Sequence, residues 1–445
     1  MMQEAVTHSQ LTYQEKLLSF ADAVKLVKTG DHIVSAMAAA EPTGLLSHLH
    51  HASAQATNVT VSTCLPMLDY AYFTDQNYLN HFQMEGWFYT PTIRRMQDVG
   101  NVSFIPNHLH FAGTKRLHHR HVNVFVGSAS TMDEHGYLSL SLSATYEREV
   151  MANADLVILE VNPNMPRTFG DTIVHIREVD YLVEHDAPIP QFPSPEPNER
   201  DQKIGAFIAE EIEDGSTIQL GIGGIPNAVA SELLGKKDLG VHTEMLTDGM
   251  VDLVEAGVIT GGKKTLVPNR LVATFALGTD KLYRFLHNNP GVQMMKGTWV
   301  NDPYVIGQNE KMVSINTTLE IDLTGQCSSE SIGHRQYSGT GGQADTAIGA
   351  QLSPGGKSFI ALYSTAMVMN QETGQRERKS KIVPALLEGA AVTLSRNDVD
   401  YVVTEYGAVC LRGTSVRERV ERLISIAHPD FREQLREEAE KRGIR

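Results

Sequence analysis

Residues 29–49 read TGDHIVSAMAAAEPTGLLSHL, and residues 213–233 read EDGSTIQLGIGGIPNAVASEL. In both stretches a Gly/Asp turn leads into a short apolar strand, a loop of small residues, a proline (Pro42 or Pro226) and an amphipathic helix. We expect each proline at the first position of its helix, where the missing N–H costs nothing. The constant offset of 184 residues indicates an internal repeat.

The repeat predicts two related domains. A second strand-like run follows each helix, at residues 58–65 (NVTVSTCL) and 239–246 (LGVHTEML), and completes a βαβ unit of the kind that builds parallel sheets. Residues 185–202 contain five prolines and suit an extended connector. We predict an α/β fold with two duplicated, open, mostly parallel sheets. The N-terminal domain spans residues 1–190, the C-terminal domain spans residues 200–445, and the active site lies between them.

Composition excludes several classes of protein. The 445 residues carry a net charge of −15, which repels a nucleic-acid backbone. Three distant cysteines cannot form a cystine scaffold, and this fits a reducing cytoplasm. Residues 1–14 are polar without an apolar signal region, and no uncharged stretch is apolar enough to span a membrane. The sequence therefore predicts a cytoplasmic protein that binds neither nucleic acid nor membrane.

The loop G-I-G-G-I-P at residues 221–226 follows a predicted strand and opens a helix. Free backbone N–H groups and the helix dipole make such a loop a site for negative charge. It also resembles a dinucleotide fingerprint, because Glu244 lies 23 residues after Gly221 at the end of the next strand. Pro226 occupies the position of the third glycine, which argues against a nicotinamide cofactor. A tight turn without any ligand is the simplest structural alternative.

Only the second half combines glycines with a carboxylate. The first-half loop reads MAAAEP without glycine, and matching STCLP to HTEML places Cys64 opposite Glu244. An acid at the end of a parallel strand, beside a glycine loop, lies in the crevice where such sheets bind ligands. A structural, salt-bridged role for Glu244 remains the alternative. The run GGKS at residues 355–358 is no P-loop, because Gln351 stands where the motif needs glycine.

Several motifs, in order along nearly the whole chain, resemble the acetyl-CoA hydrolase/transferase family, most closely its 4-hydroxybutyrate and acetate/butyrate CoA-transferase branch. They are SASTMDEHGYLSLS (128–141), NPNMPRTFGD (162–171), LGIGGIPNAV (220–229), HTEMLTDGMVDLVEAGVI (242–259), SGTGGQAD (338–345), TEYGAVCLRG (404–413) and IAHPDFR (426–432). The resemblance implies two related open α/β domains, with Glu244 as the catalytic glutamate. It also implies CoA-binding and oxyanion roles for Gly221, Gly223, Gly224, Gly341, Gly342 and Gln343.

The implied reaction is a ping-pong exchange in which CoA passes from an acyl-CoA to a small carboxylate through a glutamyl-CoA thioester. A carboxylate that is ionised at pH 7 needs no general base to attack a thioester, so Glu244 is expected to act directly. Acyl-CoA and small carboxylic acids are the expected substrates, without a prosthetic group, and a homo-oligomer is compatible with the sequence. The alternatives are an acetyl-CoA hydrolase, an NAD-dependent oxidoreductase and a non-catalytic ligand sensor.

Two further sets of residues bear on ligands. Histidines crowd the first half, but no cysteine or acid completes a recognised metal signature, so no metal is expected. The phosphates of CoA need local cations in an acidic chain, and the second half offers four candidates: Lys263, Lys264, Lys357 and Arg412. Cys410 lies beside the turn at Arg412 and Gly413, which leaves a reactive thiol open, although a buried structural role is the simpler interpretation.

Overall fold

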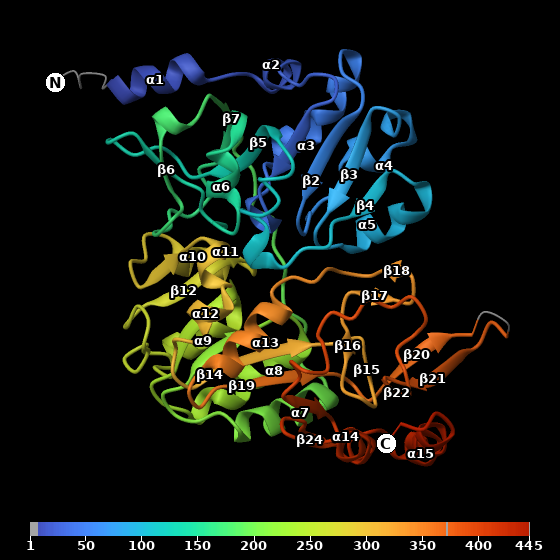
Figure 1. Ribbon diagram of the computed structural model, residues 1–445. Helices are drawn as coiled ribbons and strands as arrows, with labels where there is room; N and C mark the ends of the chain where they lie inside the picture. The colour runs from blue at the N-terminus through green and yellow to red at the C-terminus, as the bar shows by residue number, and fades with distance from the viewer. Residues whose placement is uncertain (1–7, 371–372, 445) are drawn as a thin grey trace. The chain divides into compact units, whose positions relative to one another are not determined.

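The computed structural model describes residues 8–370 and 373–444 and divides the chain into two compact units (Figure 1). Unit 1 comprises Met1–Phe192 and Leu271–Val300, and unit 2 comprises Pro193–Arg270 and Asn301–Arg445. The break after Phe192 lies close to the predicted boundary at residue 190. In contrast, residues 271–300, which the sequence interpretation assigned to the C-terminal domain, belong to unit 1. Residues 1–7 of the polar N-terminal stretch lie outside the described residues.

Unit 1 is built on one sheet whose seven strands all run parallel to their neighbours. Their order across the sheet is β4 (Val102–Phe104), β3 (Phe82–Gly86), β2 (Val59–Thr63), β1 (His32–Ser35), β5 (Val122–Ala129), β7 (Ala154–Val161) and β9 (Tyr181–Glu184). Strands β1 and β5 are buried along almost their entire length. A continuous apolar core, which includes Ile33, Val61 and Phe82, therefore packs against the sheet.

The other elements of unit 1 are short. Its helices are α1 (His8–Lys16), α2 (Phe20–Lys25), α3 (Thr43–His48), α4 (Ala71–Thr74), α5 (Pro91–Met96), α6 (Glu147–Met151), α10 (Asp280–Leu286) and α11 (Gly297–Val300). Strands β6 (Tyr137–Ser139) and β8 (Ile173–His175) pair antiparallel, and β12 (Leu271–Ala276) and β13 (Val292–Met294) pair parallel. Backbone bridges from Phe275 to Ser143 and from Met294 to Gly170 hold the inserted segment in unit 1.

Unit 2 contains a second open sheet. Its strands lie in the order β11 (Gly240–Leu246), β10 (Thr217–Leu220), β14 (Met312–Thr317), β19 (Lys357–Ala361), β23 (Tyr401–Thr404) and β24 (Gly407–Cys410), and β24 alone of these six runs antiparallel to its neighbour. The order β11-β10-β14-β19-β23 repeats the order β2-β1-β5-β7-β9 of unit 1. The predicted duplication is thus a duplication of strand topology.

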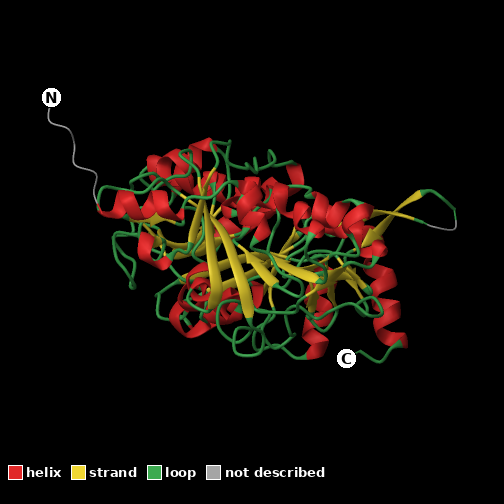
Figure 2. Cartoon of the chain, turned by 90° about the horizontal axis from the view of Figure 1, so that it is seen from above, coloured by secondary structure: helices red, strands yellow, loops and turns green. Residues whose placement is uncertain are grey.

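Helices and short strands complete unit 2. The helices are α7 (Glu199–Glu210), α8 (Gly224–Glu232), α9 (Asp248–Glu255), α12 (Pro303–Ile306), α13 (Gln343–Leu352), α14 (Val416–Ser425) and α15 (Arg432–Lys441). The short strands are β15 (Glu320–Asp322), β16 (Cys327–Ser328), β17 (Ser331–Ile332), β18 (Arg335–Gln336), β20 (Thr365–Met369), β21 (Arg376–Ser380) and β22 (Ile382–Val383). Figure 2 shows helices on both sides of the strands, and it shows the β20–β21 hairpin extending outward.

The 3-10 turns lie mainly in unit 1: η1 (Ala38–Ala40), η2 (Leu49–Ala54), η3 (Gln76–Tyr78), η4 (Gln97–Val99), η5 (Leu109–Phe111), η6 (Ile176–Glu178), η7 (Leu233–Gly235) and η8 (Pro429–Phe431). The prolines of the repeat do not occupy the predicted first helical position. Pro226 is the third residue of α8, and Pro42 immediately precedes α3. Both positions lack an intrahelical N–H partner, so the proline remains inexpensive there. In the described residues, no helix combines the length and apolarity needed to cross a bilayer.

Candidate active site

Glu244 lies in β11, two residues before the strand ends, and remains partly exposed among buried neighbours. Its carboxylate oxygen Oε2 accepts a hydrogen bond from Asn301 Nδ2 at 2.9 Å. The backbone N–H of Gly342 also donates to this carboxylate. Matching backbone hydrogen bonds, Thr60 N to Asp31 O in unit 1 and Gly240 N to Ser216 O in unit 2, align β1–β2 with β10–β11 and place Cys64 opposite Glu244, as the sequence match predicted. Glu244 is therefore held by an amide and a backbone N–H, and the structure gives it no salt bridge among the described residues.

Gly342 is the residue immediately before helix α13, so the carboxylate of Glu244 faces the positive end of that helix dipole. A Cβ atom at position 342 would overlap both Glu244 Oε2 and Asn301 Nδ2. Position 342 must consequently be glycine for the carboxylate to approach the helix this closely. Gly341, with φ of +52°, makes the turn that aims the chain into the helix.

Burial changes the acidity of Glu244. Loss of hydration raises its pKa to about 7, and the neighbouring Asp345 adds a smaller rise, while the hydrogen bonds from Asn301 and Gly342 lower it. The sequence interpretation treated this group as an ordinary ionised carboxylate at pH 7. The structure instead gives a carboxyl group that is divided between its two protonation states near neutral pH. Such a group retains more basicity, and so more nucleophilic strength, than an exposed glutamate.

A pH profile follows from this shift. Nucleophilic attack needs the ionised form, so activity should be present above pH 7 and fall as the pH drops through about 7. Measuring kcat/KM for acyl-CoA against pH should show this acid limb. Asn301→Ala removes a hydrogen bond that favours the charged form, so the limb should move to higher pH. An acid limb near the pKa of an exposed glutamate, or a limb unmoved in Asn301→Ala, would contradict this interpretation.

The side chain of Gln343 is engaged within the protein. Its side-chain Nε2 donates to Thr317 O at 2.7 Å, and its Oε1 accepts from Ser329 Oγ at 2.6 Å. Only 8% of the residue is exposed. Gln343 thus ties the first turn of α13 to the end of β14 and to the segment after β16, and it fixes the position of Gly342.

The glycine loop after β10 serves two purposes. Gly223 has φ of +123° and nothing within 4 Å of where a Cβ would stand, so the space above it is open. A Cβ on Gly224 would lie 2.5 Å from Asp201 Oδ2, so Gly224 is needed for packing against α7. Gly221 has room for a small side chain. Because β10 and β11 are adjacent, the free N–H groups at the start of α8 lie along the same sheet edge as Glu244.

Gly223→Val should therefore leave the fold intact and slow turnover. The positive φ imposes a strain of about 1–3 kcal/mol on a β-branched residue. If this strain displaces the loop from the transition state, kcat/KM should fall about 5- to 150-fold. Gly257→Val is the matched control, because Gly257 also has a positive φ and open space but lies after α9. Equal kinetics in the two variants would limit Gly223 to a role in the turn.

The four predicted phosphate cations are already engaged or lie on the outer surface. Lys357 pairs with Glu211 at 2.7 Å, and Arg412 pairs with Asp400 at 2.9 Å. Lys264 is buried and donates to a backbone carbonyl, and burial lowers its pKa to about 8. Lys263 is exposed. None of these four residues lines the groove described next.

Unit 2 has a basic groove of about 620 Å³ that follows β19 and β23. Its lining contains four cationic side chains, Arg200, Lys203, Arg378 and Lys381, and two acidic ones, Glu199 and Glu405. The Arg200 guanidinium stacks over the ring of Tyr363 at 4.0 Å, and Tyr406 forms another part of the wall. Burial lowers the pKa of Lys381 to about 8. The residues come from five separate stretches of sequence, which explains why no single motif revealed the groove.

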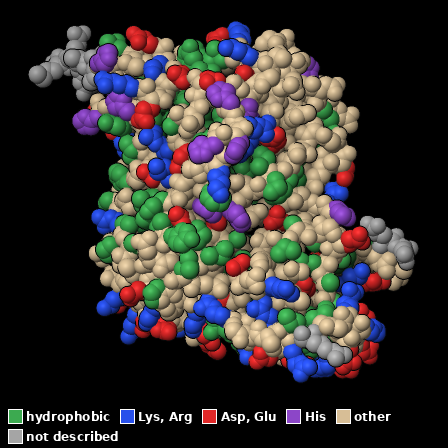
Figure 3. All heavy atoms as spheres, viewed as in Figure 1, with side chains coloured by type: hydrophobic (Ala, Val, Ile, Leu, Met, Phe, Trp, Pro, Cys, Tyr) green, Lys and Arg blue, Asp and Glu red, His purple; other side chains and the backbone are tan. Residues whose placement is uncertain are grey.

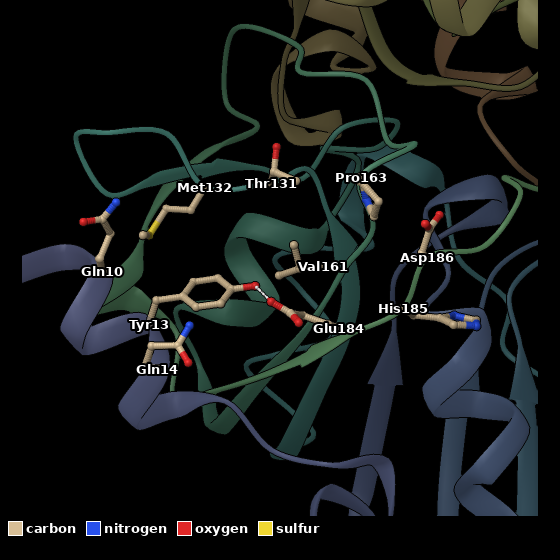
Figure 4. A pocket seen from close by; sticks show the side chains of 10 residues that line it. All are labelled: Gln10, Tyr13, Gln14, Thr131, Met132, Val161, Pro163, Glu184, His185 and Asp186. Atoms are coloured by element: carbon tan, nitrogen blue, oxygen red, sulfur yellow. Dashed lines mark hydrogen bonds between the residues drawn. The ribbon is translucent and has the colours of Figure 1, made fainter. Parts of the chain in front are cut away.

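A larger cavity in unit 1, of about 680 Å³, does not offer comparable chemistry (Figure 4). The acids Glu184 and Asp186 line it, and among the described residues no lysine or arginine does. Figure 4 shows the Tyr13 hydroxyl directed at Glu184, to which it donates a hydrogen bond of 2.8 Å. The neighbouring His185 instead contacts buried Glu160 at 2.9 Å. Its acidic lining makes this cavity unsuitable for phosphates.

Several histidine side chains are visible on the face drawn in Figure 3, whereas His32 of the first half is buried. Within residues 8–370 and 373–444, no three histidine, cysteine or acidic side chains are grouped so that they could hold a metal ion. Cys410 is half-buried, and its Sγ lies 3.7 Å from Asp400 Oδ1.

Comparison with known proteins identifies the family. The model of the acetyl-CoA hydrolase/transferase N-terminal domain matches residues 1–193, and that of the C-terminal domain matches residues 278–439. The chain belongs to the acetyl-CoA hydrolase/transferase family. The solved structure of RipA from Yersinia pestis, a protein 36% identical, superposes with a TM-score of 0.90 over 99% of this chain and 100% of that one. The two-domain α/β fold is therefore shared with a solved structure.

Curated relatives narrow the class of enzyme. A succinyl-CoA:cyclohexane-1-carboxylate CoA transferase of Geobacter metallireducens is 44% identical over 96% of this chain and 95% of its own length. A 4-hydroxybutyrate coenzyme A transferase of Clostridium kluyveri is 42% identical, and a butyryl-CoA:acetate CoA-transferase of Anaerostipes caccae is 38% identical, each over 97% of this chain. An acetyl-CoA hydrolase of Eremothecium gossypii is only 26% identical over 77%. The chain is a CoA-transferase, as its motifs implied.

Proposed function

We propose that this enzyme transfers CoA between an acyl-CoA and a small carboxylate by ping-pong exchange, with Glu244 as the nucleophile. The observation that carries this proposal is the cradle around Glu244: a buried amide, a backbone N–H and a helix N-terminus converge on one carboxylate at the carboxyl edge of a parallel sheet. Such an arrangement positions a carboxylate for attack. It holds the carboxylate by hydrogen bonds rather than by an ion pair that would neutralise its charge.

The chemistry balances without metal, ATP or a redox partner. A Glu244 oxygen attacks the thioester carbon of the acyl-CoA, and the CoA thiolate leaves, which produces an acyl-glutamyl anhydride. The thiolate then attacks the Glu244 carbonyl carbon and expels the first carboxylate, so a glutamyl-CoA thioester remains. A second carboxylate reverses these two steps and departs as the new acyl-CoA, and Glu244 is regenerated. Binding energy from the remote parts of CoA offsets the high energy of the anhydride.

The residues around Glu244 have three roles: they stabilise the oxyanion, they position the carboxylate, and they support the loop by packing. We assign the oxyanion of each tetrahedral intermediate to backbone N–H groups of the Gly221–Gly223 loop, where the space above Gly223 is open. Gly342 and Asn301 hold the attacking carboxylate, and Gly341 shapes the turn that presents them. Gly224 and Gln343, which the family resemblance placed at the CoA site, act by packing and by anchoring the loop. Their effect on CoA is then indirect.

The basic groove fits the nucleotide end of CoA. Adjacent strands lie about 4.8 Å apart, so the ends of β19 and β23 are about 14 and 19 Å from β11. This distance is of the order that an extended pantetheine arm covers. The arm would cross the ends of β10 and β14, with the thiol at Glu244. Arg200, Lys203, Arg378 and Lys381 together supply charge for the phosphates, although Lys203 also pairs with Glu199 and Arg378 with Asp430, and Tyr363 and Tyr406 supply faces against which the adenine can stack.

Arg200→Ala and Lys381→Ala should each raise KM for acyl-CoA about tenfold, because each removes a charged contact worth roughly 1.5–3 kcal/mol. The kcat value should change little, since these residues lie several strands away from Glu244. An acyl-CoA that lacks the 3′-phosphate should bind the wild type less well than acyl-CoA does. This difference in binding should be smaller in the variant whose replaced side chain contacts the 3′-phosphate in the wild type. Arg284→Ala, at an exposed site in unit 1, is the control. Equal KM values in all variants would place the nucleotide elsewhere.

The acyl group is expected to be small and not tightly selected. A single methylene changes binding by only about 1–3 kcal/mol, so acetate, propionate, butyrate and 4-hydroxybutyrate should overlap as acceptors. The relatives named for succinyl-CoA, 4-hydroxybutyrate and butyryl-CoA define the panel. The test is to incubate the enzyme with acetyl-CoA or butyryl-CoA and each acid, and to follow new acyl-CoA by mass spectrometry. Absence of exchange with every pair would overturn the proposal.

Hydrolysis of acetyl-CoA is the second candidate, because the same glutamyl thioester reacts with water if water reaches it. The distant hydrolase relative and the partial exposure of Glu244 support testing it. Free CoA should accumulate slowly without an acceptor acid, and acceptor acid should increase turnover of acyl-CoA severalfold. A rate of CoA release that is independent of the acceptor would favour the hydrolase.

A further inference from the structure

The sheet of unit 2 has a topological switch between β10 and β14. From β10 the chain continues through α8 to β11, toward one edge of the sheet, and from β14 it continues through α13 to β19, toward the other. Because such crossovers are right-handed, the two helices cover opposite faces, and a crevice opens between the ends of β10 and β14. Figure 1 shows α13 beside β14 and β19. Ligands of open α/β sheets bind in such a crevice.

Three residues form one row across the carboxyl edge of this sheet: Glu244, Gly221 and Asn316. The β10–β14 register, continued by one residue, places Gly221 beside Asn316, and the β10–β11 register, continued by three residues, places Gly221 beside Glu244. A Cβ on Gly221 would meet its nearest atoms only at 3.8 and 3.9 Å, so the middle of the row is open. Asn316 thus lies across this opening, two strand spacings or about 10 Å from the strand of Glu244.

A buried chain of hydrogen bonds fixes which end of the Asn316 amide faces the protein. Gln219 Oε1 accepts from Ile315 N at 3.1 Å, which turns this oxygen toward Ser314 Oγ at 3.2 Å. The single hydroxyl proton of Ser314 is engaged by Gln219 Oε1 or by Thr346 Oγ1, so Ser314 Oγ accepts the 2.9 Å bond from the Asn316 amide nitrogen. The same nitrogen donates to Thr346 Oγ1 of α13 at 3.0 Å. Asn316 Nδ2 therefore faces inward.

The carbonyl oxygen of this amide faces outward. Among the described residues none donates a hydrogen bond to Asn316 Oδ1, and this oxygen is not one of the polar atoms that are sealed from water without a partner. Asn316 is partly exposed, whereas Ser314 and Thr346 are buried. The buried chain thus ends at an accessible acceptor beside the crevice. A ligand that fills the crevice has to supply an N–H or O–H group to satisfy it.

We propose that Asn316 Oδ1 accepts a hydrogen bond from the amide N–H of acyl-CoA nearest the sulfur, an inference that rests on the proposed transferase function. The thioester carbonyl and an acceptor such as acetate present only lone pairs to this oxygen. The first N–H of the pantetheine arm lies two methylene groups from the sulfur, a span comparable to one strand spacing of about 4.8 Å. With the sulfur over Gly221, this N–H reaches β14. Asn316 is then a binding residue that aligns the sulfur with Glu244.

The test combines a change in the enzyme with a change in the substrate. CoA and acetyl-CoA are compared with analogues in which an ester oxygen replaces the N–H nearest the sulfur. Calorimetry gives Kd for the two CoA forms, and transfer to butyrate gives kcat/KM for the two acetyl forms. In the wild type the ester analogues should be about 3- to 10-fold poorer by both measures, which is the value of one neutral hydrogen bond. In Asn316→Ala this preference should disappear, because the acceptor is gone.

Two control variants separate contact with the substrate from support of the fold. Ser314→Ala loosens the amide of Asn316 but keeps Oδ1, so the preference for the N–H should persist. Asn397→Ala replaces an exposed asparagine in a turn of unit 2, and it should match the wild type with every substrate. A purely structural role of Asn316 would weaken both forms of the substrate equally and leave the preference unchanged.

Three results would overturn the proposal. One is a wild type that does not distinguish CoA from its ester analogue, and another is an undiminished preference in Asn316→Ala. The third is a loss in Asn316→Ala that is confined to 4-hydroxybutyrate, whose hydroxyl is the other donor among the expected substrates. Failure of the proposed transferase function would look different, as an absence of exchange in the wild type with every pair of substrates. The calorimetric comparison would still decide the role of Asn316 in that case.

Discussion

Glu244→Gln should abolish CoA exchange. The amide preserves the shape of the side chain and can still contact Asn301, but it removes the nucleophilic oxygen that must form the anhydride. Removal of a nucleophile from an otherwise intact site costs at least about 1,000-fold in kcat. Exchange between butyryl-CoA and acetate, followed by mass spectrometry, should therefore drop to the background rate. The midpoint of thermal unfolding should stay the same or rise, because the variant no longer buries a group that becomes charged near pH 7.

Chemical trapping of the glutamyl thioester tests the same assignment by labelling the nucleophile instead of removing it. Borohydride reduces a glutamyl thioester, so wild-type enzyme treated with acyl-CoA and then borohydride should lose activity, with the modification at Glu244. Glu244→Gln should remain unlabelled. Label on Glu405 or Cys410, or near-wild-type exchange in the variant, would show that the nucleophile has been misassigned. Glu405 makes a useful comparison because its carboxylate already accepts hydrogen bonds from the backbone and hydroxyl of Ser364.

Gly342→Ala is expected to be nearly as damaging, although alanine adds only one methyl group. Its Cβ would overlap Glu244 Oε2 and Asn301 Nδ2, so the carboxylate has to leave its cradle at the start of α13. A displacement of about 1 Å at a reacting group can cost about 100-fold in rate. The kcat value should fall by this factor or more, and the acid limb of the pH profile should move, because the Gly342 N–H contact is disturbed.

Gly235→Ala provides the control for this variant. Gly235 ends a 3-10 turn in the same unit, and a Cβ there would meet nothing within 4 Å. Its kinetics should match the wild type. If Gly342→Ala retained full activity and an unshifted pH profile, the contact between Glu244 and α13 would have no catalytic importance.

Local signals predicted the topology because they are carried by contiguous residues. The turn, strand, small-residue loop and helix at residues 29–49 and 213–233 each depend on neighbours in the chain, and both copies fold into the same strand order. The assignment of residues 271–300 to unit 1 could not be predicted from such local signals. Their strands are ordinary apolar runs, and the backbone bridges to Ser143 and Gly170 that assign them to unit 1 span more than a hundred residues.

Part of the candidate site could be proposed from sequence for the same reason. Glu244 and the glycine loop lie in motifs that can be read in a line, and the family resemblance rests on them. Asn301 was missed, although it immediately precedes an Asp-Pro pair that starts α12, because nothing local relates it to a residue 57 positions earlier. The cations proposed for phosphate binding were plausible by charge alone. The ion pairs of Lys357 with Glu211 and of Arg412 with Asp400, and the burial of Lys264, became visible only in three dimensions.

The sequence by itself determined the duplicated α/β topology and the family, and it predicted Glu244 as the nucleophile, since these depend on residue type and on spacing along the chain. Tertiary structure alone decided the environment of that nucleophile: the rise of the Glu244 pKa to about 7, the amide of Asn301 that holds it and the requirement for glycine at position 342. The physical reason is that hydration, hydrogen bonding and steric exclusion act through space over a few ångströms. The residues that supply them here come from β11, α13 and the segment before α12, which only the sheet and its helices bring together.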